Sequence, residues 1–468
     1  MFFMKRVISL LLMMILIFSA IGCEQNVPED EQELPEEEET PAIDMGGYAC
    51  KIMQEYPTEQ TLKYPQDTLL ADAALDRMAV LGEKYNCSIT VEGETTQAYL
   101  QALIKPLVAG QYFGEIACTH QPWYLAHSEC LYPLTEVQEY LDFTNYEKFG
   151  SIGLLELGMA KGVPYTVYPI LWPERQSSYT YNILAFDVNF MKANGLTDPR
   201  EYMDQKIWNW ETFEKVLTDY TFDLGENKIY GLMSLWPLVG DIVYANGGNF
   251  VETKEDGTLV NGLYDKKVIE AVDWCTKLFT EYADCIKKQT DYNMAVKQFI
   301  NNEGVLYHTS FSHLIQSVVY EVENFGIVPL PCGPSQTYGV WSSIIADPDS
   351  TFGIFYNAEN PEYAARIIND MLEPFDGYET KEQLKKHAGS VFFDDRDIEF
   401  YLSYLDNTRA NYWPSGTHEI WNKIRNECAK GVSGTESTQK YAATLDSIID
   451  EYLKPNYEFI NSLLSAEN

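Results

Sequence analysis

The residues that could perform catalysis are abundant in this sequence, but their spacing fits no catalytic motif. The 468-residue chain holds 70 Asp and Glu residues, and a pair of carboxylates suffices to hydrolyse a glycoside. With so many acids, candidate pairs arise by chance. The Gly-x-Ser-x-Gly nucleophile motif and a Gly-rich phosphate loop are both absent. Ser437 and Lys440 fit Ser-x-x-Lys without its partner motifs. We therefore expect no enzymatic activity.

The histidines and cysteines show no metal-binding pattern. The six histidines form no His-Glu-x-x-His set, so we expect no metal and no cofactor. Besides Cys23, eight cysteines are spread along the chain without Cys-x-x-Cys spacing. Disulfides and buried free thiols remain equally good interpretations, because a long chain needs no covalent staples. We expect mostly reduced, buried thiols with at most one or two disulfides, among Cys50, Cys87, Cys118, Cys130, Cys275, Cys285, Cys332 and Cys428.

The charge and the aromatic content narrow the class of ligand. The formal net charge is −37, and residues 1–44 hold ten of the acids and two of the bases, which leaves −29 on the remaining chain. Such a body should bind neither nucleic acid nor an anionic membrane surface. Aromatic residues make up 14 %, including 33 Tyr and 9 Trp. Beyond ordinary core packing, this content is compatible with a surface that recognises flat, partly apolar ligands.

Amphipathic helices alternate with strand-like runs along the body of the chain. Three helices have visible N-terminal caps, namely Asn209, Asp265 and Asn360, each followed by apolar residues at three-and-four spacing. Strand-like runs lie between them at residues 164–172, 229–236 and 325–331. This alternation predicts an α/β fold, and about 420 residues suit two lobes better than one core.

The N-terminus predicts export. Lys5 and Arg6 precede an apolar stretch, residues 7–21, that is shorter than the ~20 residues a spanning helix needs. The stretch ends at Ala20-Ile21-Gly22-Cys23, which resembles the lipobox of bacterial lipoproteins. In that family the cysteine is acylated and becomes the first residue. We therefore expect a signal peptide over residues 1–22 and lipidation at Cys23.

An acidic segment follows the predicted lipidation site. Residues 23–45 combine many carboxylates with several prolines and few large apolar residues. Such a composition cannot bury enough surface to offset chain entropy, so we expect a disordered tether. The body would then lie at the extracytoplasmic face of the cell membrane.

The order of short motifs in the body resembles the extracellular solute-binding proteins of ABC importers, in particular the carbohydrate-binding group. The resemblance runs from about residue 60 to the end. It rests on five elements in the expected order: "WNWETFEKVL" (208–217), "ANGG" (245–248), the phenylalanine-containing element of residues 299–311, "PLPCGP" (329–334) and "NPE" (360–362).

The resemblance implies a two-lobed periplasmic-binding-protein-like fold of type II, with lobes that are discontinuous in sequence and joined by a hinge. We expect residues 46–170 and 338–376 in lobe 1, and residues 171–337 and 377–468 in lobe 2. The crossing strands would lie near residues 165–180, 335–342 and 374–380.

A sugar offers an apolar C–H face for Trp or Tyr and a rim of hydroxyls for amides, hydroxyls and carboxylates. Residues of these types at expected strand ends, helix starts and crossings form the predicted site. The start of a helix also offers free N–H groups. The candidates are His120, Gln121, Trp123, Tyr124, Trp172, Trp236, Tyr244, Ser310, Phe311, Trp341 and Trp413.

These features predict a lipid-anchored, monomeric receptor that captures a mono- or oligosaccharide between its lobes. It would deliver the solute to the transmembrane subunits of an ABC permease. A lipid-anchored glycan-degrading enzyme and an adhesive surface lipoprotein are the alternatives. Saturable binding of a small molecule would disfavour the adhesive protein.

Overall fold

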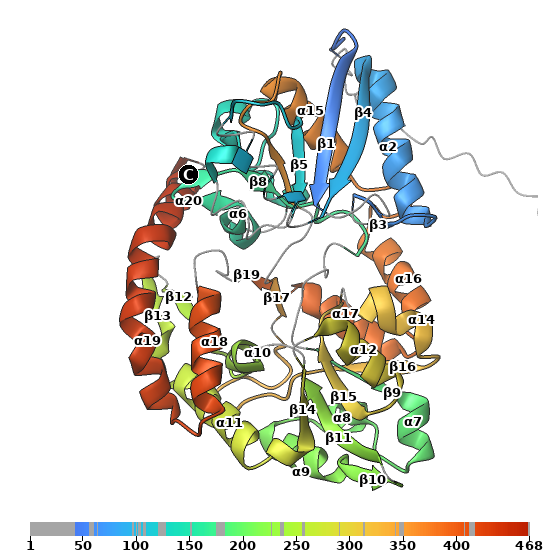
Figure 1. The fold of residues 1–468 in the computed structure, drawn as a ribbon, viewed down its shortest axis with the longest axis vertical. Helices are drawn as coiled ribbons and strands as arrows, with labels where there is room; N and C mark the ends of the chain where they lie inside the picture. The colour runs from blue at the N-terminus through green and yellow to red at the C-terminus, as the bar shows by residue number, and fades with distance from the viewer. Residues whose placement is uncertain are drawn as a thin grey trace, which may run out of the picture. The chain divides into compact units, whose positions relative to one another are not determined.

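Two main sheets organise the protein (Figure 1). The structure is a computed structural model that describes residues 43–466 except for some short stretches. These are residues 56–59, 63, 96–97, 100, 102–103, 106–108, 120–127, 150–151, 175–182, 226, 235–237, 255–257, 290, 312–313, 342, 346–350, 407 and 411–416.

The first sheet has five strands in the order β4-β1-β5-β18-β8. Strands β1, β4 and β5 run parallel, whereas β18 is antiparallel to both of its neighbours. Helices α2 and α15 pack against the sheet and against each other (Figure 1). The bounds are β1 (Tyr48–Glu55), β4 (Cys87–Glu94), β5 (Ile116–Thr119), β8 (Thr166–Val167), β18 (Thr351–Ile354), α2 (Leu69–Tyr85) and α15 (Pro361–Met371).

The core of the first sheet draws on distant parts of the chain. Trp172, Phe375 and Ile460 pack in the same hydrophobic cluster as the strands. Ile460 belongs to the last helix, within the range 377–468 that the sequence assigns to the other lobe, and the lobe boundaries stay predictions. Shorter helices also pack here, namely α5 (Tyr146–Phe149), α6 (Ile152–Leu157) and α20 (Lys454–Ala466).

The second sheet has six strands. Five follow the order β10-β11-β15-β9-β16, and β14 pairs with β11. Strands β11, β14 and β15 are parallel, and β9 is antiparallel to both of its neighbours. The bounds are β9 (Ile183–Asp187), β10 (Phe222–Leu224), β11 (Asn227–Ser234), β14 (Ile286–Lys288), β15 (Gly304–Thr309) and β16 (Phe325–Pro329).

Both faces of the second sheet are covered. Alternate residues of β9 enter two different hydrophobic clusters, because successive side chains of a strand point to opposite faces. Leu184 and Phe186 belong to one cluster, and Ile183 and Ala185 belong to the other. The first cluster includes residues of α7 (Val188–Ala193), α9 (Trp210–Asp219), α10 (Leu238–Ala245), α11 (Lys266–Thr280), α18 (Thr417–Cys428) and α19 (Gly434–Ile448), with α8 (Pro199–Asp204) packed against it. The second includes residues of α12 (Tyr292–Ile300), α16 (Lys381–Val391) and α17 (Asp395–Asp406).

Short elements complete the described part of the chain. Four two-stranded sheets pair β2 (Gln60–Thr61) with β3 (Tyr64–Pro65), β6 (Met159–Ala160) with β7 (Val163–Pro164), β12 (Val251–Thr253) with β13 (Leu259–Asn261), and β17 (Ser343–Ile345) with β19 (Thr408–Ala410). The remaining short helical segments are the 3₁₀ helices Ser128–Cys130, Leu134–Val137, Gly262–Tyr264 and Ala283–Cys285, the π-helical segments Leu314–Val318 and Ile449–Leu453, and α14 (Val319–Glu321). Among the described residues, no helix is both long enough and apolar enough to cross a membrane.

The three helix starts that the sequence predicts are confirmed. The side chains of Asn209, Asp265 and Asn360 each accept a hydrogen bond from a backbone N–H in the first turn of α9, α11 and α15. Such caps satisfy N–H groups that have no partner within the helix. Strands β11 and β16 also occupy most of the predicted runs, whereas β8 takes only two residues of its run.

A buried amide joins three segments beside the second sheet. Asn246 is fully buried, and its Nδ2 donates to the Lys267 carbonyl at 2.8 Å. Its Oδ1 accepts from the Ser335 N–H at 3.0 Å. Gly333 lies so close that an added Cβ would stand 2.2 Å from the same oxygen. The "ANGG" and "PLPCGP" motifs therefore meet in space, and their contact fixes where residues 335–342 leave the second core.

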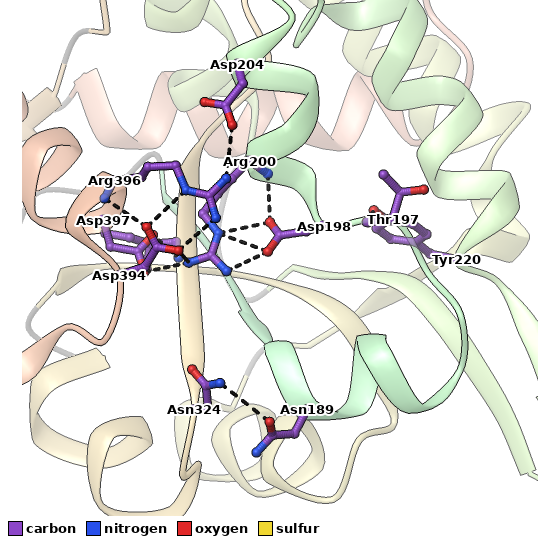
Figure 2. Close-up of polar contacts among 11 residues, drawn as sticks. Asn189, Thr197, Asp198, Arg200, Asp204, Tyr220, Asn324, Asp394, Arg396 and Asp397 are labelled. Atoms are coloured by element: carbon purple, nitrogen blue, oxygen red, sulfur yellow. Dashed lines mark hydrogen bonds and ion pairs between the residues drawn. The ribbon is translucent and has the colours of Figure 1, made fainter.

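The guanidinium of Arg200 contacts several carboxylates and links α8 to α17 (Figure 2). Arg200, 5 % exposed, donates through Nε to Asp198 Oδ1 at 2.9 Å. Its Nη1 lies 3.0 Å from Asp397 Oδ2 and 3.3 Å from Asp394 Oδ2. Arg396 donates to Asp394 at 2.7 Å. Three carboxylates thus share Arg200.

The carboxylates of this cluster differ in their ease of ionisation. Burial raises the pKa of Asp397 to about 7, although the Arg200 charge and a hydrogen bond from the Ile327 N–H act against the shift. Hydrogen bonds from Arg396 instead lower the pKa of Asp394 to about 2. Of these two carboxylates, Asp397 is therefore the one whose pKa lies near neutral pH.

Asn246→Ala should lower the free energy of unfolding by roughly 2–4 kcal/mol, because two buried backbone groups lose their partner. Urea unfolding measures the change. Asn227→Ala, at an exposed position at the start of β11, serves as the control and should stay within about 0.5 kcal/mol of the parent. Equal unfolding midpoints for the two variants would contradict the bridging role.

Asp397→Asn should change how stability depends on pH. Because the folded pKa of Asp397, about 7, exceeds the unfolded value of about 3.9, the folded state keeps a proton that the unfolded state releases. This contribution is complete below about pH 4 and is lost as pH rises to about 7, by at most about 1.4 kcal/mol per unit. Urea midpoints measured across that range should show this falling component in the parent and not in Asp397→Asn. Asp394→Asn should retain it, and a parent-like profile for Asp397→Asn would refute the assignment.

Candidate functional site

The carboxyl ends of the parallel strands form the candidate functional site. Ligands of open α/β sheets bind outside these ends. Strands β1, β4 and β5 share one such edge in the first sheet, and β11, β14 and β15 share another in the second. Carboxylates end two of these strands, a buried one at Glu55 and an exposed one at Glu94.

A buried histidine and a buried carboxylate meet at the edge of the second sheet. His308 is the penultimate residue of β15 and is paired in register with Ser234, the last residue of β11. Its Nε2 lies 2.8 Å from Oδ2 of Asp241 in the first turn of α10, and both side chains are at most 9 % exposed. Burial raises the pKa of Asp241, and the contact with His308 opposes the rise. The pair fixes the first turn of α10, which closely follows Trp236 in the sequence.

Trp172, a predicted ligand contact, lies in the core of the first sheet with no exposed surface. Its ring stacks on Phe375 with the ring centres 4.9 Å apart. It also meets Phe352 edge to face at 5.7 Å and stacks on Tyr64 at 6.1 Å. Its indole N–H donates to the Glu373 carbonyl at 3.2 Å. Because protein groups cover the ring, this structure leaves no face of Trp172 for a ligand.

Three other predicted contacts are also buried. Tyr244 is 1 % exposed and meets Trp421 edge to face at 6.1 Å. Ser310 and Phe311 have no exposed surface, although a helical turn does begin there, since the Leu314 N–H donates to the Ser310 carbonyl at 3.0 Å. These side chains pack inside the second lobe, which the helical and strand patterns alone did not reveal.

Trp341 is the described candidate that keeps exposed surface. It is half-buried, packs against both clusters of the second sheet, and meets Tyr338 edge to face at 5.4 Å. It stands two residues before β17, in the segment that the Asn246 bridge positions. A partly exposed indole on a crossing segment has a free area on which an apolar ligand face can stack.

The remaining predicted site residues lie outside the described residues. Their neighbours in sequence do not: Thr119 ends β5, Ser234 ends β11 and Ala410 ends β19. The predicted residues follow these ends by a few positions, and their roles stay predictions. They are His120, Gln121, Trp123, Tyr124, Trp236 and Trp413, and Cys23 also lies outside the description.

Polar groups that the sequence analysis missed occur at the crossing near residue 174. Glu174 Oε1 lies 3.2 Å from His387 Nε2 of α16, and the His387 ring meets Tyr378 edge to face at 5.4 Å. The contact connects the segment after Trp172 to the second lobe. The sequence analysis also missed the pair of Asp241 and His308. A polar residue within an apolar run could have indicated it, since Asp241 lies in "LVGDIVYA" and His308 in "GVLYHT".

In the described part of the chain, no group of three or more His, Cys, Asp or Glu residues is arranged to hold a metal ion. Of the polar groups at the strand edges, Glu94 is exposed, whereas Glu55, Asp241 and His308 are buried.

Comparison with known proteins gives the fold. No protein-family model matches the sequence. No curated protein matches it either. Among solved structures, the cyclic α-maltosyl-1,6-maltose binding protein of Arthrobacter globiformis is similar with a TM-score of 0.62 at 12 % identity, covering 86 % of this chain and 99 % of that protein. A receptor of Streptomyces glaucescens solved with acarbose has a TM-score of 0.58 at 11 % identity, covering 87 % and 99 %.

A third similar structure was solved with a different kind of solute. The Mycobacterium tuberculosis protein in complex with glycerophosphocholine has a TM-score of 0.56 at 12 % identity, covering 86 % of this chain and 98 % of that protein. These similarities confirm the predicted α/β fold, the two-lobed type II architecture of periplasmic binding proteins, for most of the chain. They also confirm, at the level of fold, the resemblance to sugar-binding proteins of ABC importers.

Proposed function

We propose that this protein is the solute receptor of an ABC importer and that it captures a carbohydrate between its two lobes. The observation that carries the proposal is the shared fold: 86–87 % of the chain matches binding proteins solved with acarbose or maltotriose and a protein named for binding cyclic α-maltosyl-1,6-maltose. These proteins are binding proteins, which agrees with the absence of a catalytic motif.

The proposed mechanism is closure of the lobes on the ligand. A ligand that touches both lobes stabilises the closed state by the contacts it adds to the second lobe. The receptor then presents the solute to its permease without changing it chemically.

The charges favour a neutral, hydroxyl-rich solute over an anionic one. The exposed carboxylate of Glu94 ends a strand at the edge of the first sheet, and the chain as a whole carries a formal net charge of −37. Carboxylates accept hydrogen bonds from sugar hydroxyls but repel a phosphate. The phosphodiester of glycerophosphocholine is therefore the less suitable class, although the similar structure that holds it makes it a necessary test ligand.

The residues proposed for contact are those at strand ends and crossings. Trp341 would supply a stacking surface, and His120 and Gln121 would bond the hydroxyl rim. Trp123, Tyr124, Trp236 and Trp413 would supply further aromatic faces. Trp172, Tyr244 and Phe311 are packed in the cores and serve the lobes that carry the site.

Lipid attachment at Cys23 completes the proposal. It rests on the sequence "AIGC" after a short apolar stretch and on the acidic segment that follows. The anchor would hold the receptor at the extracytoplasmic face, as a monomer near its permease. If the protein were instead a glycan-degrading enzyme, incubation with a glycan would release a product. If it were an adhesive lipoprotein, it would show no saturable binding of a small molecule.

Binding of a sugar should raise the melting temperature of the purified protein, because the ligand binds only the folded state. The panel should include maltotriose, acarbose, a cyclic maltoside and glycerophosphocholine. With the ligand that binds, Trp341→Ala should weaken affinity by about thirtyfold, about 2 kcal/mol, as for other stacking aromatic residues. Calorimetry of the folded variant measures the loss.

Trp172→Ala is the matched control for that experiment. Removing this buried ring should lower the free energy of unfolding by roughly 3–5 kcal/mol, while the folded fraction binds with parental affinity. If Trp341→Ala binds as tightly as the parent, the proposed stacking surface is wrong. If none of the three sugars binds, or if only glycerophosphocholine does, the carbohydrate proposal itself fails.

Cys23→Ser should release the protein from the membrane fraction of a bacterial host, or leave it unprocessed, because serine offers no thiol for acylation. Immunoblots of membrane and soluble fractions report the distribution. Cys285→Ser, a change at a cysteine of the folded body, should leave the protein in the membrane fraction. Membrane retention of processed Cys23→Ser would disprove lipid anchoring at this residue.

A further inference from the structure

Two cysteines far apart in the sequence meet in the core of the second lobe. Cys275 lies in α11, and Cys428 is the last residue of α18. Both are free thiols with no exposed surface. The two helices pack against each other and against α19 (Figure 1). The Cys428 Sγ lies 3.7 Å from the Val272 carbonyl, one turn before Cys275 on the same helix.

The surroundings of the two thiols act on their pKa values in opposite directions. Burial raises the pKa of Cys275 well above its usual range, whereas the hydrogen bond from Cys275 lowers the pKa of Cys428.

Cys50 and Cys87 provide a contrast. They lie on adjacent parallel strands, but Cys87 is paired in register with Tyr48 and Cys50 with Ile89. Two residues of offset and the spacing between strands place their Cα atoms roughly 8 Å apart. That separation exceeds the range that a disulfide spans.

We propose that Cys275 and Cys428 form a disulfide that joins α11 to α18. The Cys428 sulfur already lies at the turn of α11 that precedes Cys275, and a disulfide requires a sulfur–sulfur distance of about 2.05 Å with Cα atoms roughly 4.4–6.8 Å apart. The bond would join two helices that cover the same face of the second sheet, and it would close a loop that includes β14, β15 and β16. The proposal goes beyond solute capture and does not depend on which solute binds.

The oxidant in the proposed reaction is a small-molecule disulfide. The Cys428 thiolate attacks one of its sulfurs and expels a thiolate, which leaves a mixed disulfide. The Cys275 thiolate then attacks the Cys428 sulfur and expels the second small thiolate. Two protein thiols and one small disulfide thus become one protein disulfide and two small thiols. Because both cysteines are buried in the folded protein, the reaction belongs to folding, before α18 packs onto α11.

Peptide mapping of the full chain tests the proposal. The protein is unfolded, refolded in a buffer of oxidised and reduced glutathione, denatured, alkylated without reductant and digested. We expect a peptide pair linked through Cys275 and Cys428, which separates after reduction. Alkylation of both cysteines in the refolded, oxidised protein would overturn the proposal, as would exclusive pairing of either one with another cysteine.

The melting temperature provides the second readout. Reductant should lower it by several degrees in the oxidised protein, since the bond restricts the unfolded chain. Cys275→Ser and Cys428→Ser should each abolish the dependence of the melting temperature on reductant. The double variant Cys50→Ser/Cys87→Ser should retain this dependence. If any variant fails to fold, peptide mapping of the parent decides alone, and persistence of the shift in folded Cys275→Ser would refute the assignment.

Discussion

The arrangement of the crossing segment depends on one buried amide. Asn246 satisfies the Lys267 carbonyl and the Ser335 N–H at the same time, and the close approach of Gly333 leaves no room for a side chain there. A polar group buried this completely is tolerated because both of its ends are paired. Residues 335–341 start from this contact, so the place of Trp341 and of β17 follows from it.

The same contact also gives a structural reason for two of the motifs on which the sequence resemblance rests. The "ANGG" and "PLPCGP" motifs stand out in the sequence because each supplies one side of the same packing arrangement. They identify a fold in which a helix end, a helix start and a crossing segment meet. The fold itself leaves the ligand open, since proteins solved with acarbose and with glycerophosphocholine both share it with this chain.

The sequence predicted those features of the fold that depend only on neighbouring residues, such as the starts of helices. Asn209, Asp265 and Asn360 begin helices as expected, because a cap needs only its own side chain and the N–H groups of the next turn. The exposure of an aromatic ring depends instead on distant segments. Trp172 is covered by Phe352 and Phe375, which lie about two hundred residues later, so its burial was invisible in the sequence. The pairing of Asp241 with His308 was hidden for the same reason, although each interrupts an apolar run.

The tryptophans show how aromatic content divides between packing and recognition. Of the six that the structure describes, Trp172, Trp208, Trp274 and Trp421 are buried, and Trp210 stacks on Trp274 at 4.4 Å. High aromatic content in this chain therefore builds cores in the first place. An aromatic ring that contacts ligand must keep one face uncovered and must stand where both lobes are reached, which restricts it to strand ends and crossings. Trp341, a predicted ligand contact, meets the first condition, because neither cluster of the second sheet covers it fully.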